Sequence, residues 1–491
     1  MDQIIKRVEV SKTNLIIIMN DEHNKKMLGY NGHPIVQTPN LDKLASKGTV
    51  FQNAYTNSPI CVPARASLAT GRYVNQNKCW DNAIAYDGKM RSWAHHLRDS
   101  GHEVTSIGKL HYANEEIDGG FTEQLIPMHI EAGVGDLYGL IRNPLPVRYQ
   151  SRDLAQSIGP GESSYIEYDR DITAKTVQWL AANGKKQHAK PWVLFTSFIA
   201  PHSPLIAPPE YYNLYNPRNI PLPKKAAGPL HPWVQQWDDC YRFDSYFESD
   251  EQRQIAIASY YGLCSFMDNN VGTILSALET TGLAENTTVL FLSDHGDNMG
   301  ARGLWGKSTM YEESASVPMI MSGPRLKANS VVRTPVSLVD CYPTILQAVG
   351  QELDGAPLSG DSLFEIAARP YDEQRIVFSE YHAAGSVSGA YMLRKGDQKY
   401  IHYTGYRPEL FNLKSDPQEL NDLAKAGTHE NDLEQFHRDL LAICDPQQTD
   451  TLAKADQERL IAEHGGVQAI VKRGGSSYTP IPGEDVKLIG N

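Results

Sequence analysis

The sequence predicts an α/β fold in which helices cover both faces of a large, mostly parallel β-sheet, followed by a small α+β subdomain. Four short, nearly continuous apolar runs are typical of strands buried on both faces of a parallel sheet; they lie at residues 14–19, 104–107, 192–198 and 287–293. Helical patterns separate these runs, at residues 40–47, 92–99, 171–182 and 251–279. From about residue 375 the apolar runs become short and are separated by turn residues, which is typical of antiparallel strands.

Each of the four predicted strands runs into polar, titratable residues. The first ends at Asn20-Asp21 and the last at Asp294-His295. The other two run into Gly108-Lys109-Leu110-His111 and Ala200-Pro201-His202. Parallel sheets bind ligands outside the carboxyl ends of their strands. We therefore expect one edge of the sheet to carry Asp21, Lys109, His111, His202, Asp294 and His295.

The C-terminal part of the chain is predicted to form a separate, smaller unit. Short antiparallel strands are expected at residues 376–380, 391–394 and 399–403, and a helix at residues 432–441. Residues 465–491 are rich in glycine and proline, which favours an extended tail that wraps over the body or over a neighbouring subunit of a homo-oligomer. The predicted boundary divides the chain into residues 1–374 and residues 375–491.

Composition excludes several classes of protein. Of the 491 residues, 41% are hydrophobic and 21% are charged, which is usual for a soluble globular protein. The formal net charge of −12 and the scattered basic residues argue against a nucleic-acid partner. Residues 1–12 lack an apolar segment and residues 15–19 are too few to cross a bilayer, so we expect a cytoplasmic protein with no membrane partner. Six cysteines without close pairs are expected to be reduced thiols.

Cys61 opens the run Cys61-Val62-Pro63-Ala64-Arg65 at the start of a predicted helix. Proline is favoured in a first helical turn, and Gly71 is a C-terminal stop signal. Unpaired backbone N–H groups and the helix dipole favour an anion at such a start. The i, i+4 spacing brings Arg65 to the face of Cys61. The segment therefore has the features of an oxyanion site.

Asp21, Asp294 and His295 are candidate ligands of a divalent cation, because two carboxylates and an imidazole converge at the predicted sheet edge. Taken singly, each residue is better explained as a cap of the turn that follows its strand. Their order along the chain favours the metal site.

Lys109, His111 and His202 are candidate catalytic groups at the same edge, and Lys307, which follows Gly306 in the loop after Asp294, joins them. Singly they are explained as solvated surface groups or as a structural histidine. Together with the anion-favouring helix start they form a site whose charge suits a sulfate or phosphate ester.

These motifs resemble those of the type I sulfatases of the alkaline phosphatase superfamily, in order and in approximate spacing. The matching segments are Asn20-Asp21, Cys61 to Arg65 with Thr70-Gly71, Gly108-Lys109-x-His111, Pro201-His202, Ser293-Asp294-His295-Gly296 and Lys307. Gly360-Asp361-Ser362-Leu363 and Glu409-Leu410-Phe411-Asn412-Leu413 resemble the C-terminal segments of the family. The resemblance covers about residues 12–425 and implies that residues 1–374 form the catalytic domain.

The resemblance implies that Cys61 is oxidised to formylglycine by a formylglycine-generating enzyme. It also implies that one divalent metal ion is bound by Asp21, residue 61, Asp294 and His295. Many sulfatases carry two acidic residues at the first strand end and Asp-Asn at the later one, whereas here Asn20 precedes Asp21 and His295 follows Asp294. Calcium prefers oxygen ligands and an imidazole suits manganese, so both ions stay open.

The implied reaction is the hydrolysis of a small anionic sulfate ester. One hydroxyl of the aldehyde hydrate attacks sulfur, the metal and Arg65 hold the nonbridging oxygens, and Lys307, His202 or Lys109 stabilises the leaving oxygen. The second hydroxyl then loses its proton to His111, sulfate departs and the aldehyde returns.

Two alternatives to a sulfatase remain at this point. A phosphonate monoester hydrolase or phosphodiesterase also uses formylglycine, but the pair Lys109 and His111 favours a sulfatase because phosphonate enzymes are less cationic there. A non-catalytic anion-binding relative would be expected to lack the cysteine or the metal ligands, and this chain has them.

The substrate is predicted as an aryl, sugar or choline sulfate. Trp80-Asp81-Asn82 resembles a segment of cytoplasmic choline sulfatases, which makes Trp80, Asn82 and Tyr112 candidate substrate contacts. A quaternary ammonium needs an aromatic cage, and the candidates are Trp80, Tyr112, Tyr138, Trp233 and Trp237. The alternative is that these aromatic side chains serve only in packing.

Overall fold

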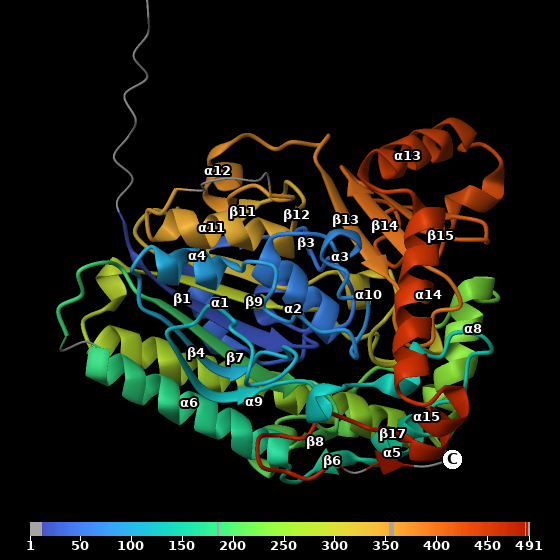
Figure 1. The fold of residues 1–491 in the computed structure, drawn as a ribbon, viewed down its shortest axis with the longest axis horizontal. Helices are drawn as coiled ribbons and strands as arrows, with labels where there is room; N and C mark the ends of the chain where they lie inside the picture. Colours follow the sequence, from blue (N-terminus) through green and yellow to red (C-terminus); the bar gives the residue numbers. More distant parts are fainter. Residues whose placement is uncertain (1–11, 184–185, 353–357, 487, 490–491) are drawn as a thin grey trace, which may run out of the picture.

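The computed structural model describes residues 12–183, 186–352, 358–486 and 488–489. Its centre is an eight-stranded sheet between two layers of helices (Figure 1). The strand order is β11 (Ser330–Val332), β2 (Thr49–Phe51), β10 (Met319–Ser322), β9 (Thr287–Ser293), β1 (Asn14–Asp21), β7 (Val193–Pro201), β4 (Val104–Lys109) and β5 (Glu123–Met128). The five strands from β9 to β5 are parallel to one another. Strand β10 is antiparallel to both β9 and β2. The predicted mostly parallel sheet is confirmed.

The register of the sheet aligns the ends of its central strands. Asn20 of β1 pairs with Ser293 of β9, and Asp21 pairs with Pro201 of β7. Gly108 of β4 pairs with Ser197 of β7. The residues that follow these four strands therefore leave the sheet at one edge, as the sequence predicts.

Each face of the sheet has its own apolar core. One core is formed with α1 (Pro39–Lys47), α6 (Ser164–Asn183) and α9 (Asp250–Thr280). The other is formed with α2 (Cys61–Thr70), α4 (Trp93–Asp99), α11 (Cys341–Ala348) and α12 (Leu363–Ala368). Side chains alternate between the two faces along a strand, so Ile16 and Ile18 of β1 join the first core while Leu15 and Ile17 join the second. This two-sided burial explains the continuous apolar runs in the sequence.

A second, four-stranded antiparallel sheet lies at the C-terminal end of the chain (Figure 1). Its order is β13 (Ile376–Tyr381), β14 (Ala390–Lys395), β15 (Gln398–Tyr403) and β16 (Glu409–Asn412). The helices α13 (Glu430–Ile443), α14 (Pro446–Glu463) and α15 (Val467–Arg473) follow it. The small C-terminal α+β unit is confirmed, while its boundary at residue 375 stays a prediction.

Helices α14 and α15 were not predicted from the sequence. The buried positions of α14 have helical spacing but are mostly polar, namely Thr449, Asp450, Ala453 and Gln457. Because the buried face is held by hydrogen bonds and an ion pair, no apolar stripe marks it in the sequence.

Shorter elements complete the fold. They are β3 (Ala54–Tyr55), α3 (Val74–Asn77), α5 (Gln150–Gln156), β6 (Ile158–Pro160), β8 (Leu205–Ala207), α7 (Pro209–Tyr212), α8 (Pro232–Tyr241), α10 (Glu312–Ala315), β12 (Val336–Ser337), β17 (Gly475–Ser476) and β18 (Leu488–Ile489). Among the described helices, none has the length and apolar character that a membrane span requires.

Candidate active site

Helix α2 places Cys61 at its first turn. The helix begins at Cys61 itself, two residues before Pro63, and all ten of its residues are buried. The N-cap position, Ile60, has no side-chain cap, and the backbone N–H of Val62 donates to Oδ1 of Asn82 over 3.2 Å. Gly71 ends the helix in the left-handed conformation with φ 64°, as the stop signal predicts. Asn82 thus contacts the first turn of the helix, and Gly71 ends its last turn.

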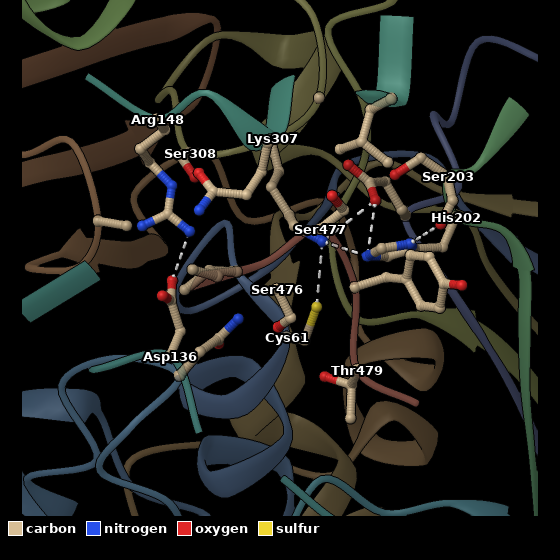
Figure 2. A pocket seen from close by; sticks show the side chains of 18 of the residues that line it. Cys61, Asp136, Arg148, His202, Ser203, Lys307, Ser308, Ser476, Ser477 and Thr479 are labelled. Carbon is tan, nitrogen blue, oxygen red and sulfur yellow. Dashed lines mark hydrogen bonds and ion pairs between the residues drawn. The ribbon is translucent and has the colours of Figure 1, made fainter. Parts of the chain in front are cut away.

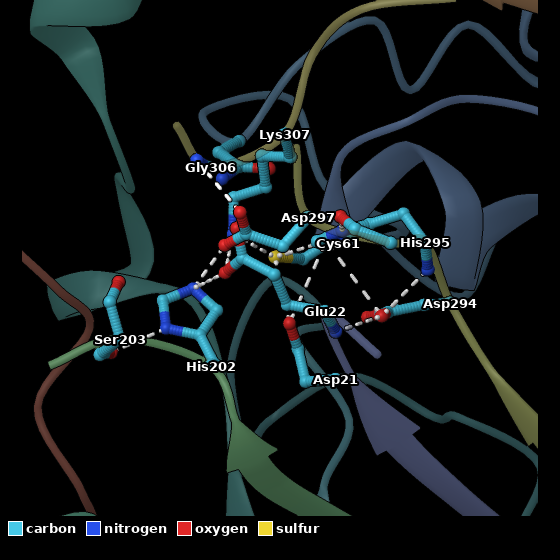
Figure 3. A network of polar contacts seen from close by, with 12 residues as sticks. Asp21, Glu22, Cys61, His202, Ser203, Asp294, His295, Asp297, Gly306 and Lys307 are labelled. Carbon is cyan, nitrogen blue, oxygen red and sulfur yellow. Dashed lines mark hydrogen bonds and ion pairs between the residues drawn. The ribbon is translucent and has the colours of Figure 1, made fainter. Parts of the chain in front are cut away.

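Four potential metal ligands meet at the sheet edge. The ligand atoms of Asp21, Cys61, Asp294 and His295 all lie within 4.8 Å of one another (Figure 3). Nε2 of His295 is 3.2 Å from Sγ of Cys61 and 3.6 Å from Oδ1 of Asp21. Nδ1 of His295 lies 3.0 Å from the carbonyl oxygen of Gly296. When Nδ1 carries the proton and donates to that carbonyl, the lone pair of Nε2 is left for a cation.

The other carboxylate oxygens of this group are paired with cations of the protein. Oδ2 of Asp21 lies 2.6 Å from the Lys109 ammonium and 3.1 Å from Nη2 of Arg65. Oδ2 of Asp294 accepts from Nε of Arg65 over 2.8 Å. Burial alone would raise the pKa of Asp21, but Lys109 and the other nearby cations hold it well below its usual range. Asp21 is thus ionised, and its Oδ1 faces the other ligands.

Arg65 lies behind Cys61 and holds the carboxylates. Nη1 donates to the carbonyl oxygen of Lys109 and to Oγ of Ser197, each over 2.8 Å. Its three nitrogens therefore all donate to protein atoms, and Arg65 does not line the cavity above Cys61. The guanidinium of Arg65 thus faces the carboxylates, and the predicted contact of Arg65 with substrate oxygens stays a prediction.

Lys307 and His202 lie on the open side of Cys61 (Figure 3). The Lys307 ammonium is 3.2 Å from Sγ of Cys61 and 2.7 Å from Nε2 of His202. Nδ1 of His202 is 2.6 Å from the carbonyl oxygen of Ser203, so a proton on Nδ1 leaves Nε2 to accept from Lys307. Burial, and then the charge of Lys307, lowers the pKa of His202 well below its usual range. His202 is therefore a neutral imidazole at neutral pH.

The loop after β9 brings Lys307 back to the sheet edge. Oδ1 of Asp297 accepts the backbone N–H of Gly306 over 3.0 Å. The backbone N–H of Asn298 donates to the carbonyl oxygen of Gly306 over 2.7 Å. These two bonds close the loop just before Lys307 and fix the start of its side chain.

His111 also lines the cavity, and Lys109 lies beside it. The backbone of His111 is in the left-handed region with φ 55° and donates to the carbonyl oxygen of Met128 over 2.8 Å. Neither ring nitrogen of His111 has a hydrogen-bond partner among the described residues. Burial, followed by the charge of Lys109, lowers the pKa of His111 well below its usual range. A neutral imidazole of this kind can accept a proton.

A buried cysteine, a cluster of metal ligands and adjacent cations at the ends of parallel strands are the arrangement that the sulfatase resemblance implies. The family model of the sulfatases matches residues 13–351. The chain belongs to the sulfatase family. A second family model, described as the C-terminal part of N-sulphoglucosamine sulphohydrolase, matches residues 300–445.

Curated relatives agree with this membership, and solved structures share the fold. A choline-sulfatase of Rhizobium meliloti is 30% identical over 84% of this chain and 83% of its own length. An arylsulfatase K of Danio rerio is 31% identical over 84% of this chain and 80% of its own length. A putative sulfatase from Bacteroides thetaiotaomicron shares the fold, with a TM-score of 0.70, 24% identity and coverage of 91% and 93% of the two chains. A phosphonate monoester hydrolase of Agrobacterium radiobacter shares it with a TM-score of 0.72, 22% identity and coverage of 88% and 95%.

Of the predicted substrate contacts of this sulfatase, Asn82 lines the cavity, whereas Trp80 and Tyr112 do not. The indole Nε1 of Trp80 donates to Asp456 of α14 over 2.9 Å, and Tyr112 packs in the core against Tyr86 and Phe121. Of the predicted aromatic cage, Trp237 lines the cavity, whereas Tyr138 and Trp233 do not. Packing explains where Trp80 and Tyr112 lie, as the alternative interpretation held.

Glu22 is a site residue that the sequence analysis missed. Its buried carboxylate is 3.1 Å from the Lys307 ammonium and 3.2 Å from Nε2 of His202. Its backbone has φ 63°, which turns the side chain after Asp21 toward the open side of the site. An acidic residue directly after a strand-end aspartate was the signal that could have identified it.

Proposed function

We propose that this sulfatase hydrolyses sulfate monoesters with a formylglycine made from Cys61. Sulfatases are sulfuric ester hydrolases, so the class of reaction follows from the family. The observation that carries the assignment of residues is the position of Sγ of Cys61. It lies between the metal-ligand group on one side and the Lys307 ammonium, 3.2 Å away, on the other.

The donor set fits one divalent cation. Two carboxylates, the residue-61 side chain and an imidazole supply hard and borderline ligands, and calcium and manganese both remain candidates. A bound cation would neutralise charge on the ester oxygens and make a hydroxyl of residue 61 more acidic. Arg65 and Lys109 keep Asp21 ionised and oriented for this purpose.

We assign departure of the leaving group and release of sulfate to Lys307, His202 and His111. Lys307 is placed to stabilise the leaving oxygen, and His202 orients the Lys307 ammonium through their 2.7 Å contact. His111, neutral and without a partner among the described residues, is placed to accept a proton during release of sulfate. Each role needs an imidazole or an ammonium in a water-poor site, where its charge interactions are strong.

The thiol of Cys61 does not suit nucleophilic attack. Burial, and then the charge of Asp21, raises the pKa of Cys61 to about 12. The thiolate is therefore scarce at neutral pH, and the thiol of the unmodified protein is a poor nucleophile. The hydrate of formylglycine instead carries two hydroxyls, one for attack and one for release of the product.

The maturation partner follows from burial. Only 1% of Cys61 is exposed and it begins a helix with no exposed residue, so a formylglycine-generating enzyme would act before α2 packs. A cytoplasmic location and a homo-oligomer stay predictions from the sequence.

The test combines mass spectrometry with turnover. The tryptic peptide that contains residue 61 should show conversion of the thiol to the aldehyde, and the converted protein should release 4-nitrophenol from 4-nitrophenyl sulfate. Cys61→Ala should lose about 10⁴-fold or more in kcat, as expected for loss of a nucleophile. Cys444→Ala, at a cysteine in the C-terminal core, is the matched control and should keep activity. Full activity of Cys61→Ala would overturn the proposal.

A phosphonate monoester hydrolase is the competing function. The presence of both Lys109 and His111 on the cavity wall favours the sulfatase. Turnover of phenyl phenylphosphonate that is much faster than that of 4-nitrophenyl sulfate would reverse this assignment.

A further inference from the structure

The cavity extends from Cys61 toward Arg148 and the C-terminal tail. Figure 2 shows Cys61 and Lys307 between His202 on one side and the pair Arg148 and Asp136 on the other. The C-terminal tail contributes Ser476, Ser477 and Thr479 to the same walls. This far side of the cavity is the part of the site that the reaction at residue 61 does not use.

Buried polar atoms without partners collect on these walls. Four of them lie away from the reacting group and have no hydrogen-bond partner among the described residues: Nη1 of Arg148, Oε1 of Gln150, Nε1 of Trp237 and Oγ of Ser477. A buried polar group without a partner costs about 1–3 kcal/mol, so such groups are rare unless a ligand or water satisfies them. Their concentration on one cavity indicates a polar ligand.

Arg148 is held in place by protein contacts that leave one side of its guanidinium free. Nη2 donates to Oδ2 of Asp136 over 2.8 Å, and the guanidinium lies over the rings of Tyr241 and Tyr138 at 5.5 and 5.8 Å. Nη1 has no hydrogen-bond partner among the residues that the structure describes. The side chain is 10% exposed. An arginine fixed in this way is preorganised for a second anion.

We infer that the substrate of this sulfatase is a sulfated sugar with a second anionic group, a carboxylate or another sulfate, that binds Arg148. This inference rests on the proposed function, because it assigns the part of the ester beyond the reacting sulfate. Gln150 needs a donor from the ligand, Trp237 needs an acceptor and Ser477 takes either, which sugar hydroxyls supply. The trimethylammonium of choline offers neither donor nor acceptor, and Arg148 repels its charge.

Turnover of matched esters tests the inference. The probes are methyl glucosides and methyl glucuronides that carry one sulfate at position 2, 3 or 4, the corresponding disulfated glucosides, choline sulfate and 4-nitrophenyl sulfate. We expect the kcat/KM of the best sulfated glucuronide or disulfated glucoside to exceed that of the glucoside with a single sulfate about 100-fold. Comparison of the sulfated glucuronides with the disulfated glucosides shows whether the second anion is a carboxylate or a sulfate. The inference is overturned if the preferred substrate is choline sulfate or a glucoside that carries a single sulfate and no second anionic group.

Substitution of the arginine locates the effect. Arg148→Gln should remove the preference for the dianionic sugar, so kcat/KM should fall much more for that sugar than for 4-nitrophenyl sulfate. Arg152→Gln is the matched control, because Arg152 is an exposed arginine four residues away that lies outside the cavity walls. An unchanged preference in Arg148→Gln overturns the assignment to Arg148.

A binding measurement separates this inference from the proposed reaction and covers a failure of the variant to fold. Calorimetry on the wild-type protein compares two anionic sugars, unsulfated methyl glucuronide and methyl glucoside 6-sulfate, with methyl glucoside. The measurement needs neither turnover nor a modified Cys61. Preferential binding of the glucuronide, or of methyl glucoside 6-sulfate, supports the subsite even if no ester is hydrolysed. Equal or weaker binding of both anionic sugars overturns it, whereas absence of any ester hydrolysis by the modified protein contradicts the proposed function.

Discussion

The Lys307 ammonium lies 2.7 Å from Nε2 of His202 and 3.2 Å from Sγ of Cys61, on the side away from the metal ligands. In the proposed mechanism, an ammonium in this place stabilises charge that develops on the leaving oxygen. Lys307→Ala should therefore lower kcat/KM by about 10³-fold for alkyl sulfates and by only about tenfold for 4-nitrophenyl sulfate, whose leaving group needs little help. A series of aryl and alkyl sulfates of graded leaving-group pKa measures this dependence.

The control for this series is Lys89→Ala, at an exposed lysine paired with Asp87. It should leave the dependence on the leaving group unchanged. An equal loss for every ester in Lys307→Ala would mean that Lys307 binds the sulfate group and does not assist departure.

Glu22 should act through Lys307. Its carboxylate contacts both Lys307 and His202, so Glu22→Gln should make turnover more sensitive to the leaving group, in the direction of Lys307→Ala. The double variant should be no worse than Lys307→Ala alone, because residues that act as a unit are not additive. Additive losses in this double-mutant cycle, with correctly folded proteins, would show that Glu22 works independently.

The imidazole of His295 should decide which cation the site prefers. His295→Asn replaces a nitrogen ligand by an amide oxygen, which suits calcium, so the ratio of bound calcium to manganese should rise. Elemental analysis after dialysis against equal concentrations of both ions measures the ratio. Asn298→Ala, which alters the loop without removing one of the four ligands, is the control. A ratio that does not change in His295→Asn would remove His295 from the ligand set.

The position of the site could be predicted from sequence because of a simple property of parallel sheets. Neighbouring parallel strands end at the same edge, so Asp21, His202 and Asp294 meet wherever the connecting helices run. The register that joins β1, β7 and β9 required no knowledge of loop conformation. The same reasoning placed Lys109 and His111 after β4.

The remaining features depend on tertiary structure that no local pattern records. The side-chain direction of Glu22 follows from a left-handed backbone, and Arg148 reaches the cavity from a segment without strand or helix periodicity. Trp80 follows α2 closely in sequence, yet its indole contacts α14, a helix that the sequence did not predict. Proximity along the chain was therefore a poor guide to the side chains that line the cavity.

The buried pair of Arg142 and Asp450 should stabilise the C-terminal subdomain in a pH-dependent way. Nη2 of Arg142 donates to Oδ1 of Asp450 over 3.0 Å, and both side chains are 4% exposed. Burial opposes ionisation of Asp450, but Arg142 holds its pKa below the ordinary value of 3.8. Burial lowers the pKa of Arg142, yet an arginine stays protonated across this range. The stabilisation is thus complete above the unfolded pKa of Asp450 and is lost as the pH falls through the folded one.

Asp450→Asn should accordingly lower the free energy of unfolding by about 3 kcal/mol at neutral pH, because it leaves a buried guanidinium unpaired. The difference from the wild type should shrink below about pH 4. Urea denaturation at a series of pH values measures both effects. Lys454→Ala removes the half-exposed partner of the same carboxylate and should cost less than about 1 kcal/mol. A loss that is independent of pH would assign the effect to packing.

We expect the C-terminal tail to line the cavity of the chain to which it belongs and not to join two subunits. Ser476 bonds to Glu131, the hydroxyl of Tyr165 donates to the carbonyl oxygen of Thr479 over 2.6 Å, and Tyr478 packs on the ring of Tyr165. Removal of residues 474–491 should raise KM for sugar sulfates about tenfold and leave kcat for 4-nitrophenyl sulfate nearly unchanged, because the residues around Cys61 stay in place. Tyr165→Phe, which removes one tail contact, should have a smaller effect in the same direction. Light scattering decides between the two predicted positions of the tail: an unchanged mass supports a wall within one chain, and a fall in mass would show that the tail joins subunits.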